Sequence, residues 1–214
     1  MSDSTAQVIR LVAGLGNPGR EYDGTRHNVG FAVLDRIASK FGVSFVKESK
    51  WDAFIARVTL YPGLELVLLK PTTFMNLSGD SVGEYARFYR IPSTATLVVL
   101  DDVALPLGAL RLRTEGGSGG QKGLGSVLIH FATEQVPRLR VGVGEASDNR
   151  DLSAHVLSRF SSEEQNNASE AIERAAAAVL CAAREGMIPA MNLYNAARNS
   201  DKSLPQQDTI AIQP

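Results

Sequence analysis

The chain has 214 residues and a formal net charge of −1, with 44% hydrophobic and 21% charged residues; this balance is typical of one globular domain rather than a disordered chain. No apolar run reaches the roughly 20 residues that a membrane-spanning helix needs, and the N-terminal stretch lacks the basic and apolar regions of a signal peptide. The single cysteine, Cys181, excludes an internal disulfide, so we expect a protein of the reducing cytoplasm.

The first predicted element is a short buried strand. Residues 9–15 form an apolar run that ends in a Gly/Pro/Asn cluster, as a strand does when it leads into a loop. Apolar residues then recur at helical spacing over about 29–41, and Asn28 is placed to cap that helix. Two β-rich runs, 54–60 and 64–69, are separated by a Pro-Gly turn and predict a hairpin.

The second half of the chain alternates strands and helices. A strongly apolar strand at 96–100 runs into Asp101 and Asp102. Ser162 is placed to cap a long Ala-rich helix that ends near Gly186. The other elements are a loop at 71–78, a helix at 79–89, a strand at 110–113, a helix at 124–131 and a strand at 139–143.

This order of elements predicts the α/β class. Alternating strands and helices with one inserted hairpin favour a single-domain, three-layer α/β/α arrangement around a twisted mixed sheet. We expect one catalytic domain over residues 1–198. From residue 199 the composition becomes polar and aperiodic, so residues 199–214 are expected to form a mobile C-terminal tail.

The first glycine cluster does not meet the requirements of a dinucleotide site. Residues 14–19 (GLGNPG) have GxGxxG spacing after a strand, and Asp35 follows at a suitable distance. A dinucleotide site also needs a helix that begins within the motif, so that its amides face the pyrophosphate. Pro18 and the polar residues after it keep the chain in a loop until about Asn28, which disfavours this interpretation.

The second glycine cluster, residues 116–123, does not form a P-loop. That motif needs glycine directly before its lysine and Ser or Thr directly after it, and here Gln121 and Gly123 flank Lys122. A Gly-rich loop with a lysine at the start of a helix can still offer amides and positive charge to a phosphate. A plain surface turn remains an equal alternative.

Other catalytic chemistries lack their residues. The three histidines, His27, His130 and His155, have no partners at metal-ligand spacing, and no GxSxG serine motif is present. We therefore expect neither a metal nor a cofactor. Basic residues gather in the middle of the chain, which allows either a local nucleic-acid face or a solvated surface without a partner. They are Arg87, Arg90, Arg111, Arg113, Lys122, Arg138 and Arg140.

His27 is the strongest candidate for a general base. It lies between the loop after the first strand and the first helix, and α/β proteins bind ligands in loops at the carboxyl ends of strands. Asp101 ends another central strand and can reach the same crevice. A carboxylate bonded to one imidazole nitrogen fixes the tautomer, which leaves the other nitrogen to take a proton from water. Asn17 and Asn76 can supply amide donors to a carbonyl oxygen or its oxyanion.

The segments around these residues also carry a resemblance to a known family. They are residues 14–19 (GLGNPG), Tyr22, residues 25–28 (TRHN), residues 71–79 (PTTFMNLSG), Asp101 and residues 138–144 (RLRVGVG). In this order, over roughly residues 8–195, they resemble bacterial-type peptidyl-tRNA hydrolase. The resemblance implies a metal-free, usually monomeric enzyme. It would cleave the ester that joins a peptide to the 3′ end of tRNA, and so recycle peptidyl-tRNA dropped by ribosomes during translation.

The resemblance also implies roles for individual residues. It assigns water activation to His27 and the orienting role to Asp101. Asn17 and Asn76 would hold the substrate and water, and Tyr22 would lie against the tRNA end. Further contacts to the tRNA acceptor end and its 5′ phosphate are expected from Phe74, Gln121, Lys122, Arg111 and Arg113.

Four positions depart from the family pattern. The Gly-rich loop usually carries a His-Asn pair, and this chain has Gln121 and Lys122 there. Leu100 replaces a histidine that often precedes the aspartate, and Ala104 replaces an acid. A lysine donates hydrogen bonds but accepts none, so it can grip a phosphate but cannot replace a neutral amide.

Two other functions stay open at this point. The altered loop also fits an RNA-binding protein of the same fold that has lost catalysis, although the intact His27, Asp101, Asn17 and Asn76 argue against that. The third possibility, a dinucleotide-dependent enzyme, would show bound nicotinamide or flavin in the absorbance spectrum of the purified protein.

Overall fold

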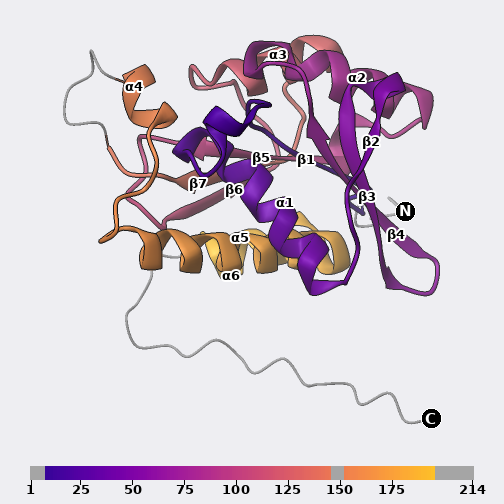
Figure 1. Ribbon diagram of the computed structural model, residues 1–214. Coiled ribbons are helices and arrows are strands. Elements are labelled where there is room, and N and C mark those ends of the chain that lie inside the picture. The colour runs from indigo at the N-terminus through magenta and orange to yellow at the C-terminus, as the bar shows by residue number, and fades with distance from the viewer. Residues whose placement is uncertain (1–7, 146–151, 196–214) are drawn as a thin grey trace.

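One mixed sheet of seven strands organises the computed structural model, which describes residues 8–145 and 152–195 (Figure 1). The strand order is β2-β3-β4-β1-β5-β7-β6. In chain order the strands are β1 (Leu11–Gly14), β2 (Val46–Glu48), β3 (Ala53–Tyr61), β4 (Leu64–Pro71), β5 (Thr96–Asp102), β6 (Leu110–Arg113) and β7 (Arg138–Gly142).

The helices lie on both faces of this sheet. The α-helices are α1 (Val29–Lys40), α2 (Ser78–Phe88), α3 (Lys122–Phe131), α4 (Leu152–Leu157), α5 (Gln165–Glu185) and α6 (Met187–Tyr194). Short 3-10 turns are η1 (Arg20–Tyr22), η2 (Arg26–Asn28), η3 (Ser49–Trp51), η4 (Met75–Leu77) and η5 (Ser93–Ala95). Figure 1 shows α2 and α3 over one face, with α1, α5 and α6 on the other. The predicted three-layer α/β/α arrangement is therefore confirmed.

The four central strands, β4, β1, β5 and β7, are parallel, whereas β2, β3 and β6 pair antiparallel with their neighbours. Strands β1 and β5 are buried along their whole length, as parallel strands covered on both faces must be. Gly14, the last residue of β1, pairs with Val99, and β5 continues to Asp102. The carboxyl ends of the two strands therefore meet at the same edge.

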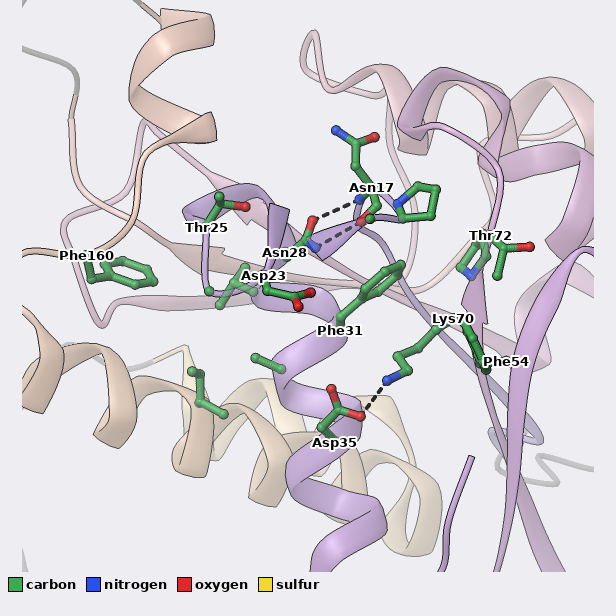
Figure 2. A pocket seen from close by; sticks show the side chains of 17 residues that line it. Asn17, Asp23, Thr25, Asn28, Phe31, Asp35, Phe54, Lys70, Thr72 and Phe160 are labelled. Atoms are coloured by element: carbon green, nitrogen blue, oxygen red, sulfur yellow. Dashed lines mark hydrogen bonds and ion pairs between the residues drawn. The ribbon is translucent and has the colours of Figure 1, made fainter. Parts of the chain in front are cut away.

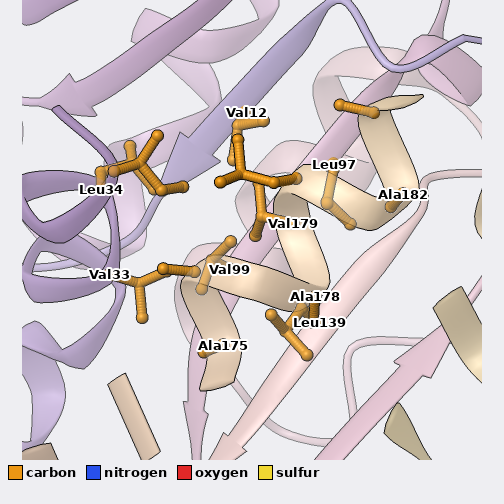
Figure 3. Close-up of a cluster of buried hydrophobic side chains, with 14 of the residues drawn as sticks. Val12, Val33, Leu34, Leu97, Val99, Leu139, Ala175, Ala178, Val179 and Ala182 are labelled. Atoms are coloured by element: carbon orange, nitrogen blue, oxygen red, sulfur yellow. The ribbon is translucent and has the colours of Figure 1, made fainter. Parts of the chain in front are cut away.

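Two hydrophobic clusters hold the layers together, one on each face of the sheet. In the cluster of Figure 3, Val12, Val99 and Leu139 of the sheet face an alanine stripe of α5 that includes Ala175 and Ala178. Small side chains on that stripe let the helix backbone approach the strands closely, and this supports the close packing of the interior.

Several predicted boundaries were wrong. The long helix begins at Gln165, with Glu164 rather than Ser162 at its N-cap, and Gly186 at φ 95° separates it from α6, which the sequence did not predict. Asn28 occupies the N-cap position of α1, but its side chain makes no capping bond. In the described ranges, no helix is long and apolar enough to cross a membrane. The predicted tail at 199–214 lies outside the described residues.

Candidate active site

The first helix lies unusually close to the sheet, and this closeness positions His27. A Cβ atom on Gly30 would lie 2.5 Å from the carbonyl oxygens of both Leu15 and Val99, and one on Gly14 would lie 2.5 Å from the Gly30 oxygen. Only glycine allows this approach of backbone to backbone. The turn η2, which carries His27, is therefore held over the ends of β1 and β5. Gly14 serves helix packing, and the chain stays out of α-helix until Val29, as the sequence predicted.

His27 and Asp101 form the predicted pair. His27 Nδ1 lies 2.8 Å from Asp101 Oδ2, and the two side chains are 16% and 4% exposed. An ionised carboxylate can only accept, so Nδ1 carries the proton in this pair. Nε2 then bears the lone pair, and no described residue hydrogen-bonds to it. This is the arrangement that lets an imidazole take a proton from water.

Asn17 is fixed by three hydrogen bonds. Its backbone N–H donates to Asn28 Oδ1 at 2.8 Å, and Asn28 Nδ2 donates back to its carbonyl oxygen at 3.0 Å, as the dashed lines of Figure 2 show. Its side-chain Oδ1 accepts from the backbone N–H of Met75 at 2.8 Å. Asn17 Nδ2 has no partner in the described part of the chain, so it can donate to a ligand. Asn76 follows Met75 directly and is exposed.

The Gly-rich loop joins this site through Gln121. Its Nε2 donates to Asp101 Oδ1 at 3.1 Å, and its Oε1 accepts from the backbone N–H of Leu124 at 2.7 Å, which caps α3. With a contact of 3.3 Å from Nε2 to Met75 Sδ, the Gln121 side chain has three protein partners instead of being free for a substrate. Lys122, the next residue, is exposed.

Arg138 binds the backbone of the Gly-rich loop. It is 2% exposed, and its Nη1 donates to the carbonyl oxygens of Gly116 and Gly117 at 2.5 and 3.4 Å. Burial lowers the pKa of its guanidinium; Glu134 partly offsets this, and the nearby cations Arg140 and Arg113 lower the pKa further. A loop pinned over clustered positive charge is a suitable place for an anion.

The arginines of β6 and β7 share one face of the sheet. Arg111 pairs with Arg140 across the two strands, and Arg113 pairs with Arg138. Arg111 and Arg113 are exposed. Arg140 Nε lies 2.8 Å from Asp102 Oδ2, a close ion pair whose angle does not make a hydrogen bond. The charge of Arg140, which lies beside Arg111, is therefore partly neutralised by Asp102.

The remaining candidates lie around this centre. Tyr22 is half-buried in η1, and Phe74 is 57% exposed just before η4. The structure brings His27, Asp101, Asn17 and Gln121 into one network, with Met75 linking them. Five candidates are exposed, and their side chains make no hydrogen bond with the described residues: Phe74, Asn76, Lys122, Arg111 and Arg113. Within residues 8–145 and 152–195, no three His, Cys, Asp or Glu side chains lie together as metal ligands.

Sequence reasoning missed Asn28, Met75 and Arg138 as parts of the site. Asn28 stands in the TRHN segment, but its position before a helix suggested only a cap. Arg138 and Met75 act through contacts 22 and 58 residues away in the chain, with Gly116 and Asn17 respectively. No local pattern signals contacts of that range.

A pocket of about 310 Å³ lies beside the site (Figure 2). Asn17 borders it, Phe31 and Asp35 of α1 line its floor, and Phe54 and Lys70 close one end. Lys70 pairs with Asp35 there. Asn17 lines this pocket but His27 and Asp101 do not, so the pocket adjoins the His27–Asp101 pair without containing it.

Known proteins match nearly the whole chain. A family model described as Peptidyl-tRNA hydrolase matches residues 11–203. A peptidyl-tRNA hydrolase of Caldanaerobacter subterraneus is 44% identical over 185 residues, which cover 86% of this chain and 98% of that protein. One from Gloeobacter violaceus is 42% identical, covering 88% and 94%. The match runs a few residues into the predicted tail.

A solved structure gives the same result for the fold. Peptidyl-tRNA hydrolase from Acinetobacter baumannii superposes with a TM-score of 0.84 at 37% identity, over 90% of this chain and 97% of that one. The resemblance drawn from the sequence is confirmed, because the chain belongs to the peptidyl-tRNA hydrolase family.

Proposed function

We propose that this chain hydrolyses the ester bond of peptidyl-tRNA with a water molecule activated by His27. Family membership supports the reaction, and the contact that carries the residue assignment is the 2.8 Å pairing of His27 Nδ1 with Asp101. It leaves Nε2 without a hydrogen-bond partner among the described residues. No metal or covalent intermediate is needed in this scheme.

The reaction follows from these groups. Nε2 of His27 takes a proton from water as the water oxygen attacks the ester carbonyl carbon, and Asp101 stabilises the imidazolium that forms. The negative charge on the former carbonyl oxygen is met by amide donors, for which Asn17 Nδ2 and Asn76 are our candidates. The carbon–oxygen bond to the ribose then breaks, and the imidazolium returns its proton to the ribose oxygen. The products are tRNA with a free hydroxyl and a peptide with a free carboxyl group.

The tRNA is held by its backbone in our proposal. Lys122, Arg111 and Arg113 are exposed cations near the Gly-rich loop and would contact phosphates of the acceptor end, including the 5′ phosphate. Tyr22 and Phe74 would contact the terminal nucleotide. Phosphate contacts carry no sequence information, so many different tRNAs should be substrates.

The surrounding properties are proposed on the same basis. We expect a monomer working in the cytoplasm, with residues 1–198 as the catalytic unit. An inactive RNA-binding protein of this fold has no observation in its favour, and the contacts of His27 with Asp101 and of Asn17 with Met75 support the active alternative.

The test is release of free tRNA from purified peptidyl-tRNA, without added metal. The wild-type protein should release it, and His27→Ala should not, while both bind the substrate with similar affinity. Unchanged turnover in His27→Ala would remove His27 from the mechanism. Binding without release by the wild type would instead favour the inactive RNA-binding alternative.

A further inference from the structure

We infer that Gln121 is a positioning residue for Asp101 rather than a substrate contact, an inference that rests on the proposed function of the His27–Asp101 pair. Its side-chain amide joins the catalytic carboxylate to the first turn of α3. Gln121 comes from the Gly-rich loop, 20 residues beyond Asp101 in the chain.

The carboxylate of Asp101 is bound at both oxygens. His27 Nδ1 lies 2.8 Å from Oδ2, and Gln121 Nε2 donates to Oδ1 at 3.1 Å. The Asp101 side chain is 4% exposed, so it depends on protein donors. With only one oxygen bound, the carboxylate could turn about its Cβ–Cγ bond, and the imidazole bonded to it would turn as well. The second donor at Gln121 removes that freedom.

The hydrogen bond to Gln121 Oε1 determines which way the side-chain amide is turned. Oε1 accepts from the backbone N–H of Leu124 at 2.7 Å, one of the N–H groups that the first turn of a helix leaves unpaired. A flipped amide would lose this cap and would set its oxygen against the Asp101 carboxylate. Both contacts therefore require the same orientation, with nitrogen toward Asp101.

Gln121 also reaches the segment that fixes Asn17. Its Nε2 lies 3.3 Å from Met75 Sδ, and the backbone N–H of Met75 donates to Asn17 Oδ1. The start of α3 also packs against this side chain, because a Cβ atom on Gly123 would lie 2.4 Å from Met75 Sδ. One side chain thus touches the base-orienting carboxylate and the residue that holds Asn17. Because both ends of the Gln121 amide are bound to the protein, Lys122 rather than Gln121 is available to face the substrate.

Two substitutions separate positioning from helix capping. Gln121→Glu keeps an oxygen that can accept from Leu124 but replaces the donor to Asp101 with a second oxygen. Gln121→Ser also keeps a good N-cap and loses the donor without adding charge. Gln121→His supplies a different N–H donor to Asp101, so it tests whether any donor at this position is sufficient.

A hydrogen bond to a charged group contributes about 1.5–3 kcal/mol, which corresponds to roughly 10- to 100-fold in rate. We expect kcat to fall by up to about 100-fold in Gln121→Glu, which adds a negative charge, and by about 10-fold, the low end of that range, in Gln121→Ser. KM for peptidyl-tRNA should stay within about twofold, since the lost contact is not to the substrate. Gln121→His should keep most of the wild-type kcat.

Other outcomes overturn the inference. A raised KM with unchanged kcat would make Gln121 a substrate contact. A wild-type kcat in both Gln121→Glu and Gln121→Ser would mean that Gln121 only caps α3 and does not position Asp101.

A readout without turnover separates this inference from the proposed function. The imidazole nitrogen resonances of His27, measured by NMR on the full chain, report its hydrogen bond to Asp101. They should change in Gln121→Glu and Gln121→Ser and return in Gln121→His. Identical resonances in all four proteins would refute the positioning role, even if peptidyl-tRNA proved not to be the substrate. A changed signal without tRNA release by the wild type would refute only the reaction.

Discussion

Arg26 donates through Nη2 to Glu164 Oε2 at 2.7 Å, and this ion pair ties the residue before His27 to the turn that begins α5. The Arg26 residue is only 6% exposed. Its guanidinium also donates to the carbonyl oxygen of Val143 at 3.0 Å and lies 4.7 Å from the centre of the Phe160 ring. The segment after β7 is therefore fastened to the turn that carries the proposed base.

This ion pair predicts a loss of stability in acid. The hydrogen bond from Arg26 lowers the pKa of Glu164 from its ordinary 4.5 to about 2, so the folded state favours the ionised carboxylate. The contribution is complete above about pH 5 and is lost as pH falls from about 4.5 toward 2. A shift of this size corresponds to about 3 kcal/mol, and since the side chain is 30% exposed we expect roughly 1–2 kcal/mol.

Glu164→Gln should remove this dependence. Urea unfolding of both proteins at pH 7, 4.5 and 3 should show the variant less stable at pH 7, with the difference in the free energy of unfolding shrinking at pH 3. A difference that stays constant over this range would mean that the carboxylate charge at Glu164 does not stabilise the fold.

Replacement of Asp101 tests the orienting role. Asp101→Asn keeps the volume but presents a neutral amide to His27, which no longer favours the Nδ1–H tautomer. A buried orienting aspartate of this kind is worth on the order of 100- to 10,000-fold in kcat, and we expect a loss in that range with little change in KM. Single-turnover release of tRNA would measure it.

Asp35→Asn is the matched control. Asp35 is an exposed carboxylate on α1 that pairs with Lys70, and it lies outside the proposed catalytic network. It should turn over as the wild type does. An equal loss in both variants would point to a general effect of removing acidic charge.

The contact between His27 and Asp101 could be predicted from the sequence, because the strand order alone brings the two residues together. His27 follows the strand that ends at Gly14, Asp101 ends the neighbouring parallel strand, and parallel strands meet at their carboxyl ends. The role of Gln121 could not be predicted, since a glutamine in a Gly-rich loop has the same local pattern whether it faces a ligand or a carboxylate. Arg26 illustrates the same limit, because its partner Glu164 is 138 residues away.

The close packing of α1 predicts a sharp penalty at Gly30. A methyl group there would meet the carbonyl oxygens of Leu15 and Val99 at 2.5 Å, both parts of the backbone. Gly30→Ala must therefore push the helix away from the sheet, at a cost of roughly 1–3 kcal/mol in the free energy of unfolding. Because η2 moves with the helix, kcat should fall as well. Thermal unfolding and tRNA release measure the two effects.

Gly125→Ala is the control for this substitution. Its added methyl would find only the Ser118 side chain, at 3.7 Å, which is ordinary contact. Since alanine favours a helix over glycine by up to about 1 kcal/mol, this variant should be as stable as the wild type or more so. If both variants lost stability alike, the close approach at Gly30 would not be the cause.

Lys122 gives a prediction that depends on salt. Each phosphate neutralised by a cationic side chain releases counterions, so the logarithm of the binding constant falls with the logarithm of salt concentration by about 0.7–0.9 per contact. Lys122→Asn should therefore flatten the slope for tRNA binding by about that amount, and weaken binding most at low salt. Lys40→Asn, at the exposed end of α1, changes the net charge equally but lies away from the Gly-rich loop. It should leave the slope as it is. If the two variants flattened the salt dependence equally, the effect would come from the overall charge of the protein. The phosphate contact would then have to be sought at Arg111 or Arg113 by the same comparison with Lys40→Asn.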